Sequence, residues 1–247
     1  MSSTVPEKLG GHQLIEKRQW PWIAQQNWQD ILFIHLPTSY EKLRSLVPAP
    51  FKIDTYDGQG WMSIVLFRAT HSRLRYMPEP LSFPPFYQMN IRTYVTFRNE
   101  PGVYFFSINT NNSFVKLGGS LASLPFSKAN MTMQQEEDKI YFEANRLFNE
   151  RNAAFKVAYS PDVSSFSPRA ASLSYFLTER YCIWMFRGNT ILKAPILHSR
   201  WNLQQATISI LKNTNLPFHF TEDMIAHYAP FKHSLIHPFE RFGKVSK

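Results

Sequence analysis

Residues Phe83–Ala129 read FPPFYQMNIRTYVTFRNEPGVYFFSINTNNSFVKLGGSLASLPFSKA. Two runs in this stretch, Ile91–Phe97 and Val103–Ile108, are rich in Val, Ile, Thr, Tyr and Phe, which suit a pleated, half-buried surface. The short polar segment Arg98–Gly102 separates the two runs and contains Pro and Gly. This pattern predicts a β-hairpin.

The same alternation of short apolar runs and turns continues on both sides of that hairpin. Two more hairpins are predicted, one across Asn149–Asn152 and one across Arg187–Asn189. The remaining expected strands are Ile31–Leu36, Phe51–Tyr56, Trp61–Ala69, Asn130–Met133, Ile140–Phe148, Ala153–Tyr159, Arg180–Phe186, Thr190–Leu197 and Thr207–Leu211. Many short strands with few helices favour one antiparallel β-barrel or sandwich, a mainly β fold of the α+β kind.

Two short helices are expected between these strands. Thr38 and Glu41 match a capping box, with Thr38 as N-cap, and the helix would end near Val47, before a proline. The second helix is expected over Pro168–Thr178, with Ser167 as N-cap and Pro168 at the first helical position. Asn213–Pro217 is expected to form a turn, and the region from there to Phe242 has a mixed pattern that predicts no regular element.

The chain is expected to form one domain over residues 20–247, preceded by a flexible polar leader over residues 1–19. The leader has no apolar segment typical of a signal peptide, and no apolar run approaches the roughly 20 residues that span a bilayer. Cys182 is the single cysteine, so no disulfide can form within the chain, and its apolar surroundings favour a buried thiol. We therefore expect a cytoplasmic protein that has no membrane partner.

The amino-acid composition bears on the kind of partner that the protein is expected to bind. Apolar residues make up 44% of the 247 residues, and the net charge is +9. An excess of positive charge favours anionic ligands, although it also serves solubility. The basic residues are scattered and form no nucleic-acid motif, so no nucleic-acid partner is expected. The oligomeric state stays open, and a homo-oligomer is compatible with the sequence.

Sequence motifs for metals and nucleotides are absent. The chain contains no CxxC, HExxH, GxSxG or phosphate-loop pattern. His227, His233 and His237 are the nearest approach to a ligand cluster, but they follow no spacing typical of a metal site. We expect no metal and no cofactor.

Arg92 is an unusual residue for a predicted strand. If the pleat holds, its side chain faces away from Ile91 and Thr93 and shares its face with Tyr94. That face is either a solvated outer surface or a polar wall in the interior. In the second case the guanidinium of Arg92 would bind a carboxylate, with Tyr94 beside it.

A second group of candidates lies at a junction between the last predicted helix and a strand. Glu179 and Arg180 form either a local ion pair or a buried acid with a shifted pKa. His198 and Trp201 follow the end of a strand, where a histidine is either structural or active in proton transfer.

The chain resembles the YqjF-like family of uncharacterised proteins over nearly its whole length. The matching segments are NWQDILFIHLPTSYEKLRSLVP, DTYDGQGWMSIVLFR, NIRTYV, VYFFSINTNN, FLTERYC and HSRWNLQQA. They occur in the family's order, with Leu36 where the family usually has Trp and Leu66 where it usually has Pro.

That family is in turn similar to acetoacetate decarboxylase, and the resemblance implies a closed antiparallel β-barrel with a central pocket. The segments EKLRSLVPAPFKID, PFYQMN and Gly118–Ala129 carry this second resemblance. The enzyme needs a nucleophilic lysine with a second cation beside it. Those lysine positions are Phe126 and Ser127 here, and the two acidic positions are Val65 and Met89. The resemblance therefore implies the barrel without the decarboxylase lysine pair.

We expect the protein to bind a small acidic or carbonyl-bearing molecule in that barrel. The expected ligand-binding residues are Arg92, Asn109, Glu179, Arg180, Tyr94 and Trp201, and weak catalytic candidates are Lys128, Glu179 and His198. Lys128 lies on the face of Phe126 one strand step further on, where it would either reach the pocket or extend to solvent. A converted enzyme with a replaced catalytic set and a scaffold or partner-binding protein are the two alternatives.

Overall fold

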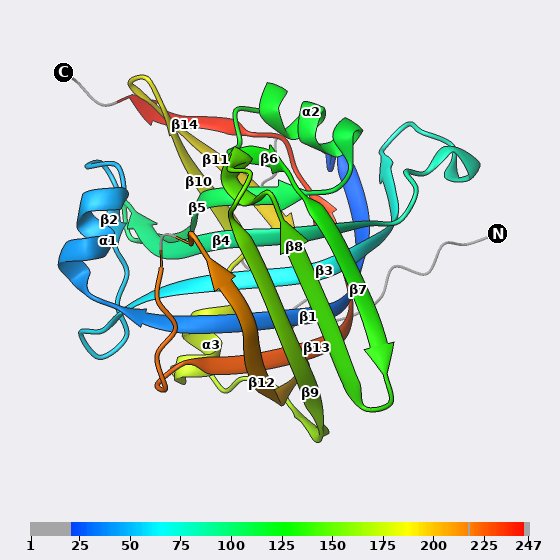
Figure 1. The fold of residues 1–247 in the computed structure, drawn as a ribbon. Coiled ribbons are helices and arrows are strands. Elements are labelled where there is room, and N and C mark those ends of the chain that lie inside the picture. Colours follow the sequence, from blue (N-terminus) through cyan, green and yellow to red (C-terminus); the bar gives the residue numbers. More distant parts are fainter. Residues whose placement is uncertain (1–20, 217, 245–247) are drawn as a thin grey trace.

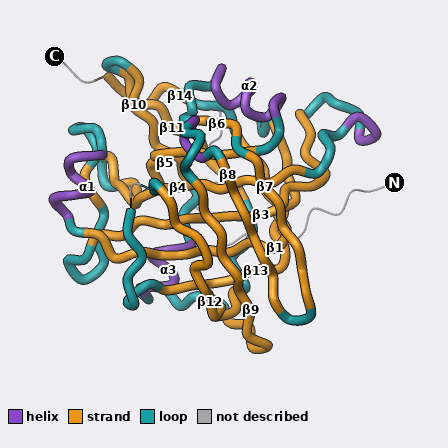
Figure 2. Tube along the Cα trace, viewed as in Figure 1, coloured by secondary structure: helices purple, strands orange, loops and turns teal. Residues whose placement is uncertain are grey.

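A computed structural model describes residues 21–216 and 218–244. Figure 2 shows that strands make up most of the molecule and that the helices are short and peripheral. The strands are β1 Ala24–Thr38, β2 Lys52–Ile53, β3 Gly60–Leu74, β4 Phe86–Phe97, β5 Glu100–Thr110, β6 Phe126–Lys128, β7 Asn130–Glu136, β8 Lys139–Asn145, β9 Ala154–Phe166, β10 Cys182–Arg187, β11 Thr190–Leu197, β12 Leu203–Thr214, β13 Ile225–Ile236 and β14 Glu240–Lys244. The α-helices are α1 Tyr40–Leu46, α2 Ser113–Leu121 and α3 Leu173–Thr178, with 3-10 turns at Glu79–Leu81 and Leu147–Asn149. The predicted mainly β fold with few short helices is confirmed.

The predicted hairpin in the middle of the chain is present as β4 and β5. Its turn is tighter than expected, because Phe97 pairs directly with Glu100 and only two residues lie between them. Arg98 and Asn99 both have positive φ, 50° and 63°. Two consecutive left-handed residues are typical of the type I′ turn, whose twist matches that of the flanking strands. This turn sets the register of the strands that carry the candidate site.

The strands pair in one continuous sheet. Their order is β14-β11-β10-β5-β4-β3-β1-β13-β12-β9-β8-β7, and β11 pairs in addition with β13 through Ile196↔Ile236 and Leu197↔Leu235. This extra pairing joins β13, β1, β3, β4, β5, β10 and β11 into a closed circuit of neighbours. The pairings are antiparallel except for β5 with β10 and β5 with β6, which are parallel.

Strands β12, β9, β8 and β7 form a second layer over the circuit, while β2, β6 and β14 pair with strands of the circuit itself. Figure 1 shows β7, β8 and β9 crossing in front of β1, β3 and β13 at a steep angle. Alternate residues of β1, β3 and β4, such as Leu32, Ile64 and Ile91, point into the space between the layers and meet Phe142 and Phe155. These side chains are at most 2% exposed. Burial of this apolar core stabilises the pair of layers, at roughly 25 cal/mol for each Å² removed from water.

The other face of the same strands points into the circuit. Ile31 and Phe33 of β1 and Val65 and Phe67 of β3 belong to a separate apolar cluster, together with Trp201. Because side chains alternate along a strand, each of these strands contributes one face to each cluster. The inner face is the one that surrounds the candidate site.

Both predicted N-caps are wrong. The cap of α1 is Ser39, whose side chain accepts a hydrogen bond from Lys42 N–H, because β1 continues through Thr38 and pairs it with Gly60. The cap of α3 is Ser172, which accepts from Tyr175 N–H, and α3 starts at Leu173. Ala171 has a positive φ of 65°, a conformation incompatible with a helix, so the segment after Ser167 cannot be helical throughout.

Helix α2 and strands β13 and β14 were not predicted. Helix α2 contains the adjacent glycines Gly118 and Gly119, which lower its helix propensity. Its N-cap is Asn112, whose side chain accepts hydrogen bonds from Phe114 N–H and Val115 N–H. Strands β13 and β14 occupy the segment that was expected to be irregular. Strand β13 buries polar residues such as His227 and Lys232. Its buried and exposed positions therefore do not alternate between apolar and polar residues in the sequence. The predicted leader over residues 1–19 lies outside the described residues.

Candidate functional site: a cavity inside the strand circuit

A cavity of about 130 Å³ lies on the inner face of the circuit. Its wall is formed by eight strands, which are β1, β3, β4, β5, β6, β10, β11 and β13. Helix α2 and the segments on either side of β10 and β11 complete the wall. Its lining consists of Gln26, Trp28, Ile31, Phe33, Val65, Phe67, Gln88, Asn90, Arg92, Val103, Phe105, Ile108, Val115, Leu124, Phe126, Thr178, Arg180, Cys182, Ile183, Ile196, His198, Trp201 and Ile236. The wall is mainly apolar with a few polar groups, as small-molecule sites commonly are.

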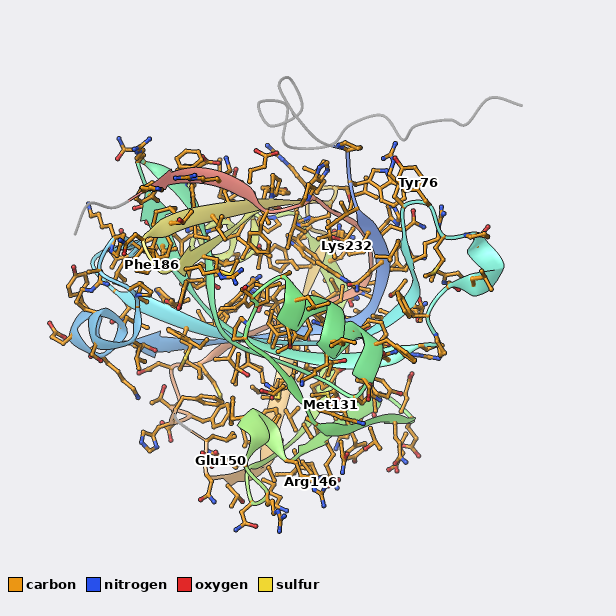
Figure 3. The ribbon with its side chains drawn as sticks, turned by 90° about the horizontal axis from the view of Figure 1, so that it is seen from above. Tyr76, Met131, Arg146, Glu150, Phe186 and Lys232 are labelled. Carbon is orange, nitrogen blue, oxygen red and sulfur yellow. The ribbon has the colours of Figure 1, made fainter. Side chains whose placement is uncertain are left out.

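Helix α2 closes one side of this cavity. Val115 of α2 and Leu124 and Phe126, which follow it, line the cavity. Figure 3, a view from above, shows α2 in front of the strands, while Tyr76 lies at the edge of the molecule in the loop after β3. Tyr76 is 89% exposed, and the loop around it contributes no lining residue.

Arg92 faces the cavity from β4. It pairs with Phe105 of β5, and both side chains line the cavity, since directly opposed residues in a ladder share a face. Its Nη2 donates to the Leu177 carbonyl at 3.4 Å, and its guanidinium lies 5.8 Å from the ring centroid of Phe33. Burial lowers the pKa of Arg92 from its ordinary value. Of the two alternatives for Arg92, the structure shows the interior wall, and the side chain does not lie on a solvated outer face.

The guanidinium of Arg92 has no carboxylate partner within the described residues. Its buried Nε also lacks a hydrogen-bond partner there. A buried cation without a counter-ion is costly, because removing charge from water is compensated only by pairing and hydrogen bonds. Arg92 thus lines the cavity as a cation that has no acidic partner among the described residues.

Arg180 also lines the cavity, but its charge is already paired. Its Nη1 lies 2.7 Å from Oδ2 of Asp54, and its Nε donates to the Phe176 carbonyl at 2.7 Å. The guanidinium also stacks over the Phe176 ring at 4.3 Å. Arg180 therefore serves to hold the start of β10 against Asp54, and offers less to a ligand than Arg92 does.

Tyr94 lies behind Arg92 and does not line the cavity. Its hydroxyl donates to the Leu177 carbonyl at 2.9 Å and makes a short hydrogen bond with Ser63 Oγ. Ser63 Oγ in turn lies 2.6 Å from His35 Nδ1. Burial raises the pKa of Tyr94 and lowers the pKa of His35 well below its usual range. This buried network supports the wall that carries Arg92.

Two amides that the sequence did not single out lie beside Arg92. Gln88 and Asn90 occupy the preceding alternate positions of β4 and line the cavity, and Gln88 Nε2 donates to Asn90 Oδ1 at 3.4 Å. The signal was available, since the positions 88, 90 and 92 all carry polar residues in a strand of period two.

His198 and Trp201 line the far wall. The Nδ1–H of His198 donates to the Ser199 carbonyl at 2.8 Å, and burial lowers the pKa of His198 to about 4, so the ring is neutral near pH 7. The indole Nε1–H of Trp201 donates to the Thr178 carbonyl at 2.9 Å. His198 is thus a neutral ring at the cavity wall that is held by hydrogen bonds to the backbone.

Glu179 is buried but does not line the cavity. Its Oε1 accepts the backbone N–H of Trp201 at 3.0 Å, and its Oε2 accepts the hydroxyl of Tyr181 in a short hydrogen bond. Nearby, Lys232 donates from Nζ to the Arg200 carbonyl at 2.8 Å and lies over the Trp201 ring. Burial lowers the pKa of Lys232, against the opposing effect of Glu179. Both groups hold the segment that positions Trp201.

Asn109 does not share a cavity with Arg92, and the expectation that both face one interior is wrong. Asn109 pairs with Met89, which belongs to the core between the two layers, so its side chain points to that core. Its Nδ2 donates to Ser107 Oγ at 2.8 Å, and its Oδ1 accepts Phe148 N–H at 3.1 Å. Positions 89 and 92 differ by an odd number and therefore lie on opposite faces.

Lys128 is exposed at the end of β6 and is not among the lining residues, whereas Phe126 is. Ser127 is buried on the opposite face. Cys182 is buried, as expected, and burial raises the pKa of its thiol. Neither a lysine nor a reactive thiolate is presented by the described wall.

Metal ligands do not cluster in residues 21–216 and 218–244: no group of three or more His, Cys, Asp and Glu side chains could hold an ion there. None of the helices in the described chain has the length and apolar character that a membrane crossing requires.

Solved structures of low sequence identity share this fold. An acetoacetate decarboxylase-like enzyme from Sphingomonas wittichii RW1 aligns with a TM-score of 0.61 and 12% identity, over 94% of this chain and 98% of that one. Acetoacetate decarboxylase from Legionella pneumophila aligns with a TM-score of 0.63 and 10% identity, over 99% of each chain. The enduracididine biosynthesis enzyme MppR, complexed with pyruvate, aligns with a TM-score of 0.66 and 9% identity, over 99% of this chain and 100% of that one. The chain therefore has an acetoacetate decarboxylase-like fold.

Sequence comparison defines the family more narrowly. Residues 25–232 match the DUF2071 family model, described as an uncharacterized conserved protein. The uncharacterized protein YqjF of Bacillus subtilis (strain 168) is 36% identical over 227 residues, which cover 90% of this chain and 93% of that protein. The chain belongs to the DUF2071 family, and the predicted YqjF-like resemblance is confirmed.

Proposed function

We propose that this protein binds a small carboxylate in its cavity, with Arg92 as the anchor. In this proposal the closed circuit of strands is an acetoacetate decarboxylase-like β-barrel within one domain over residues 20–247. The cavity is its central pocket, and the ligand is a small acidic or carbonyl-bearing molecule.

The observation that carries the proposal is the state of Arg92. Its guanidinium is buried beside a cavity and meets no acid within the described part of the chain, while the neighbouring Arg180 is paired with Asp54. A ligand carboxylate would supply the missing charge and accept bonds from the guanidinium fork. The pyruvate complex of MppR, a protein of similar fold, supports a small carboxylate as the ligand.

The wall does not favour the decarboxylase reaction. Phe126 is the lining residue at the position that resembles the enzyme's lysine, and Lys128 is exposed. The proposal is therefore a binding protein that lacks the lysine pair. The open cavity favours ligand binding over a scaffold role, because a purely structural interior would be filled by side chains.

Two measurements test the proposal. Native mass spectrometry of the purified protein should detect a co-purifying small acid, and calorimetry should detect binding of a short carboxylate such as pentanoate. Arg92→Leu should weaken pentanoate binding by about 1.5–3 kcal/mol, the usual net contribution of a charged hydrogen-bonded contact. Lys128→Leu removes an exposed positive charge and is the matched control, which should bind like the wild type. Equal affinity of the two variants would refute the role of Arg92.

A further inference from the structure

Gln88 and Asn90 define a second polar position in the cavity wall beside Arg92. All three residues lie on β4 at alternate positions and line the cavity. Successive alternate residues of a strand are separated by about 6.6–6.8 Å. A ligand whose charged end meets Arg92 therefore extends along these two amides.

Their mutual hydrogen bond leaves the NH₂ group of Asn90 and the Oε1 atom of Gln88 without a partner among the described residues. Gln88 Nε2 donates to Asn90 Oδ1 at 3.4 Å. No other hydrogen bond within the described residues involves Asn90 Nδ2 or Gln88 Oε1. The pair thus offers a donor from Asn90 and an acceptor from Gln88, side by side.

The pair offers a donor and an acceptor in either orientation of the two side-chain amides. If both side-chain amides were rotated, Asn90 would donate to Gln88, and the pair would then leave a donor on Gln88 and an acceptor on Asn90. In either orientation the matching ligand group is one that both accepts and donates. A primary amide does so within a single planar group.

The remaining wall restricts the part of the ligand between its two ends. Phe33, Val65, Phe67 and Phe105 line the cavity with apolar surface. The cavity volume of about 130 Å³ is close to the roughly 150 Å³ of an apolar cavity that holds benzene. The middle of the ligand is therefore short and apolar.

We propose that the ligand is a short-chain carboxylic acid that carries a terminal amide, with the carboxylate on Arg92 and the amide on Gln88 and Asn90. This inference rests on the proposed function and adds the second recognition element. Polar groups in an apolar wall discriminate strongly between ligands, because an analogue lacking the matching atoms leaves them unpaired.

Glutaramate is a suitable probe, compared by calorimetry with its isopropyl isostere, in which a CH(CH₃)₂ group replaces the amide. Wild-type protein should bind glutaramate roughly tenfold more tightly or better, as expected for two hydrogen bonds to otherwise unpaired groups. Asn90→Leu should abolish that preference while it retains the isopropyl acid. Gln26→Leu, which changes another lining amide whose Oε1 already accepts from Trp28, should retain the preference.

The outcomes separate the two proposals. If both acids bind equally well and Arg92→Leu weakens both, the carboxylate site stands and the amide site is refuted. An unchanged glutaramate preference in Asn90→Leu also refutes the amide site. If neither acid binds to the wild type, both proposals are overturned.

Discussion

The guanidinium groups of Arg92 and Arg180 lie against the same ring, that of Tyr94, at 6.0 Å and 5.2 Å from its centroid. Arg180 is neutralised by Asp54, while no acid within the described residues reaches Arg92. The two cations therefore differ in what they contribute. The charge of Arg180 is compensated within the folded chain, whereas the charge of Arg92 lies beside the cavity without an acidic partner among the described residues.

Arg92→Met should make the ligand-free protein more stable. The variant replaces a buried cation that has no acidic partner with an apolar side chain of similar length. Replacing even a paired buried charge in this way is neutral or stabilising by about 1–4 kcal/mol, so a gain of about 1 kcal/mol or more is expected. Urea unfolding at neutral pH measures the free energy directly. A clear loss of stability would mean that Arg92 is structural.

Asp54→Asn should destabilise the protein strongly, since it leaves Arg180 as an uncompensated buried charge. The expected loss is about 3 kcal/mol, the lower end for a broken buried pair, because Asp54 keeps some contact with solvent. Glu143→Gln is the matched control, as it breaks the exposed pair with Lys156 and should cost at most about 1 kcal/mol. Equal losses in the two variants would contradict the difference in burial.

The adjacent glycines of α2 should respond in opposite directions to alanine. A Cβ on Gly119 would lie 2.2 Å from the Phe126 ring, which lines the cavity, while a Cβ on Gly118 would meet nothing within 4 Å. Gly118→Ala should stabilise the protein by about 0.5–1 kcal/mol through helix propensity.

Gly119→Ala should instead cost about 1–3 kcal/mol through overpacking and displace the ring of Phe126. Thermal unfolding of the two variants tests the difference, and pentanoate titration tests whether the cavity has changed. Two equally stabilised variants would show that α2 is not packed on Phe126.

Stability should fall as the solution becomes acidic. Burial lowers the pKa of both His198 and His227 to about 4, so below the ordinary value of 6.5 the unfolded chain binds protons that the folded chain does not. The stabilisation is complete above pH 6.5 and is lost as the pH falls toward 4, by about 1.4 kcal/mol per pH unit for each histidine.

His198→Asn should reduce that slope, measured by urea unfolding across this pH range. His71→Asn, which changes an exposed histidine, provides the mutational control. A wild-type stability independent of pH between 6.5 and 4 would contradict the burial of these rings.

Local sequence patterns predicted the β4–β5 hairpin, the mainly β class and the family. Runs of β-forming residues, turn residues and matching segments are all properties of short stretches of sequence. The face of Arg92 could be stated as two alternatives. Period two placed Arg92 opposite Ile91, but which face is covered depends on how the sheet folds on itself.

Asn109 shows where sequence reasoning failed in the candidate site. Its face is set by its pairing with Met89, and the β4–β5 ladder has a register shift between Ile91 and Arg92. One extra residue in a strand changes which side chains share a face, and no composition pattern reports it.

Contacts between distant segments were decided by the tertiary structure alone. Asp54 and Arg180 are 126 positions apart, and β13 closes the circuit with β11 although its buried polar residues conceal a strand pattern. The sequence by itself determined the family and most of the strands, but not β13 and β14. The tertiary structure determined which of the two cavity-lining arginines has an acidic partner, because the pairing of charges depends on distances in space that the order of residues does not specify.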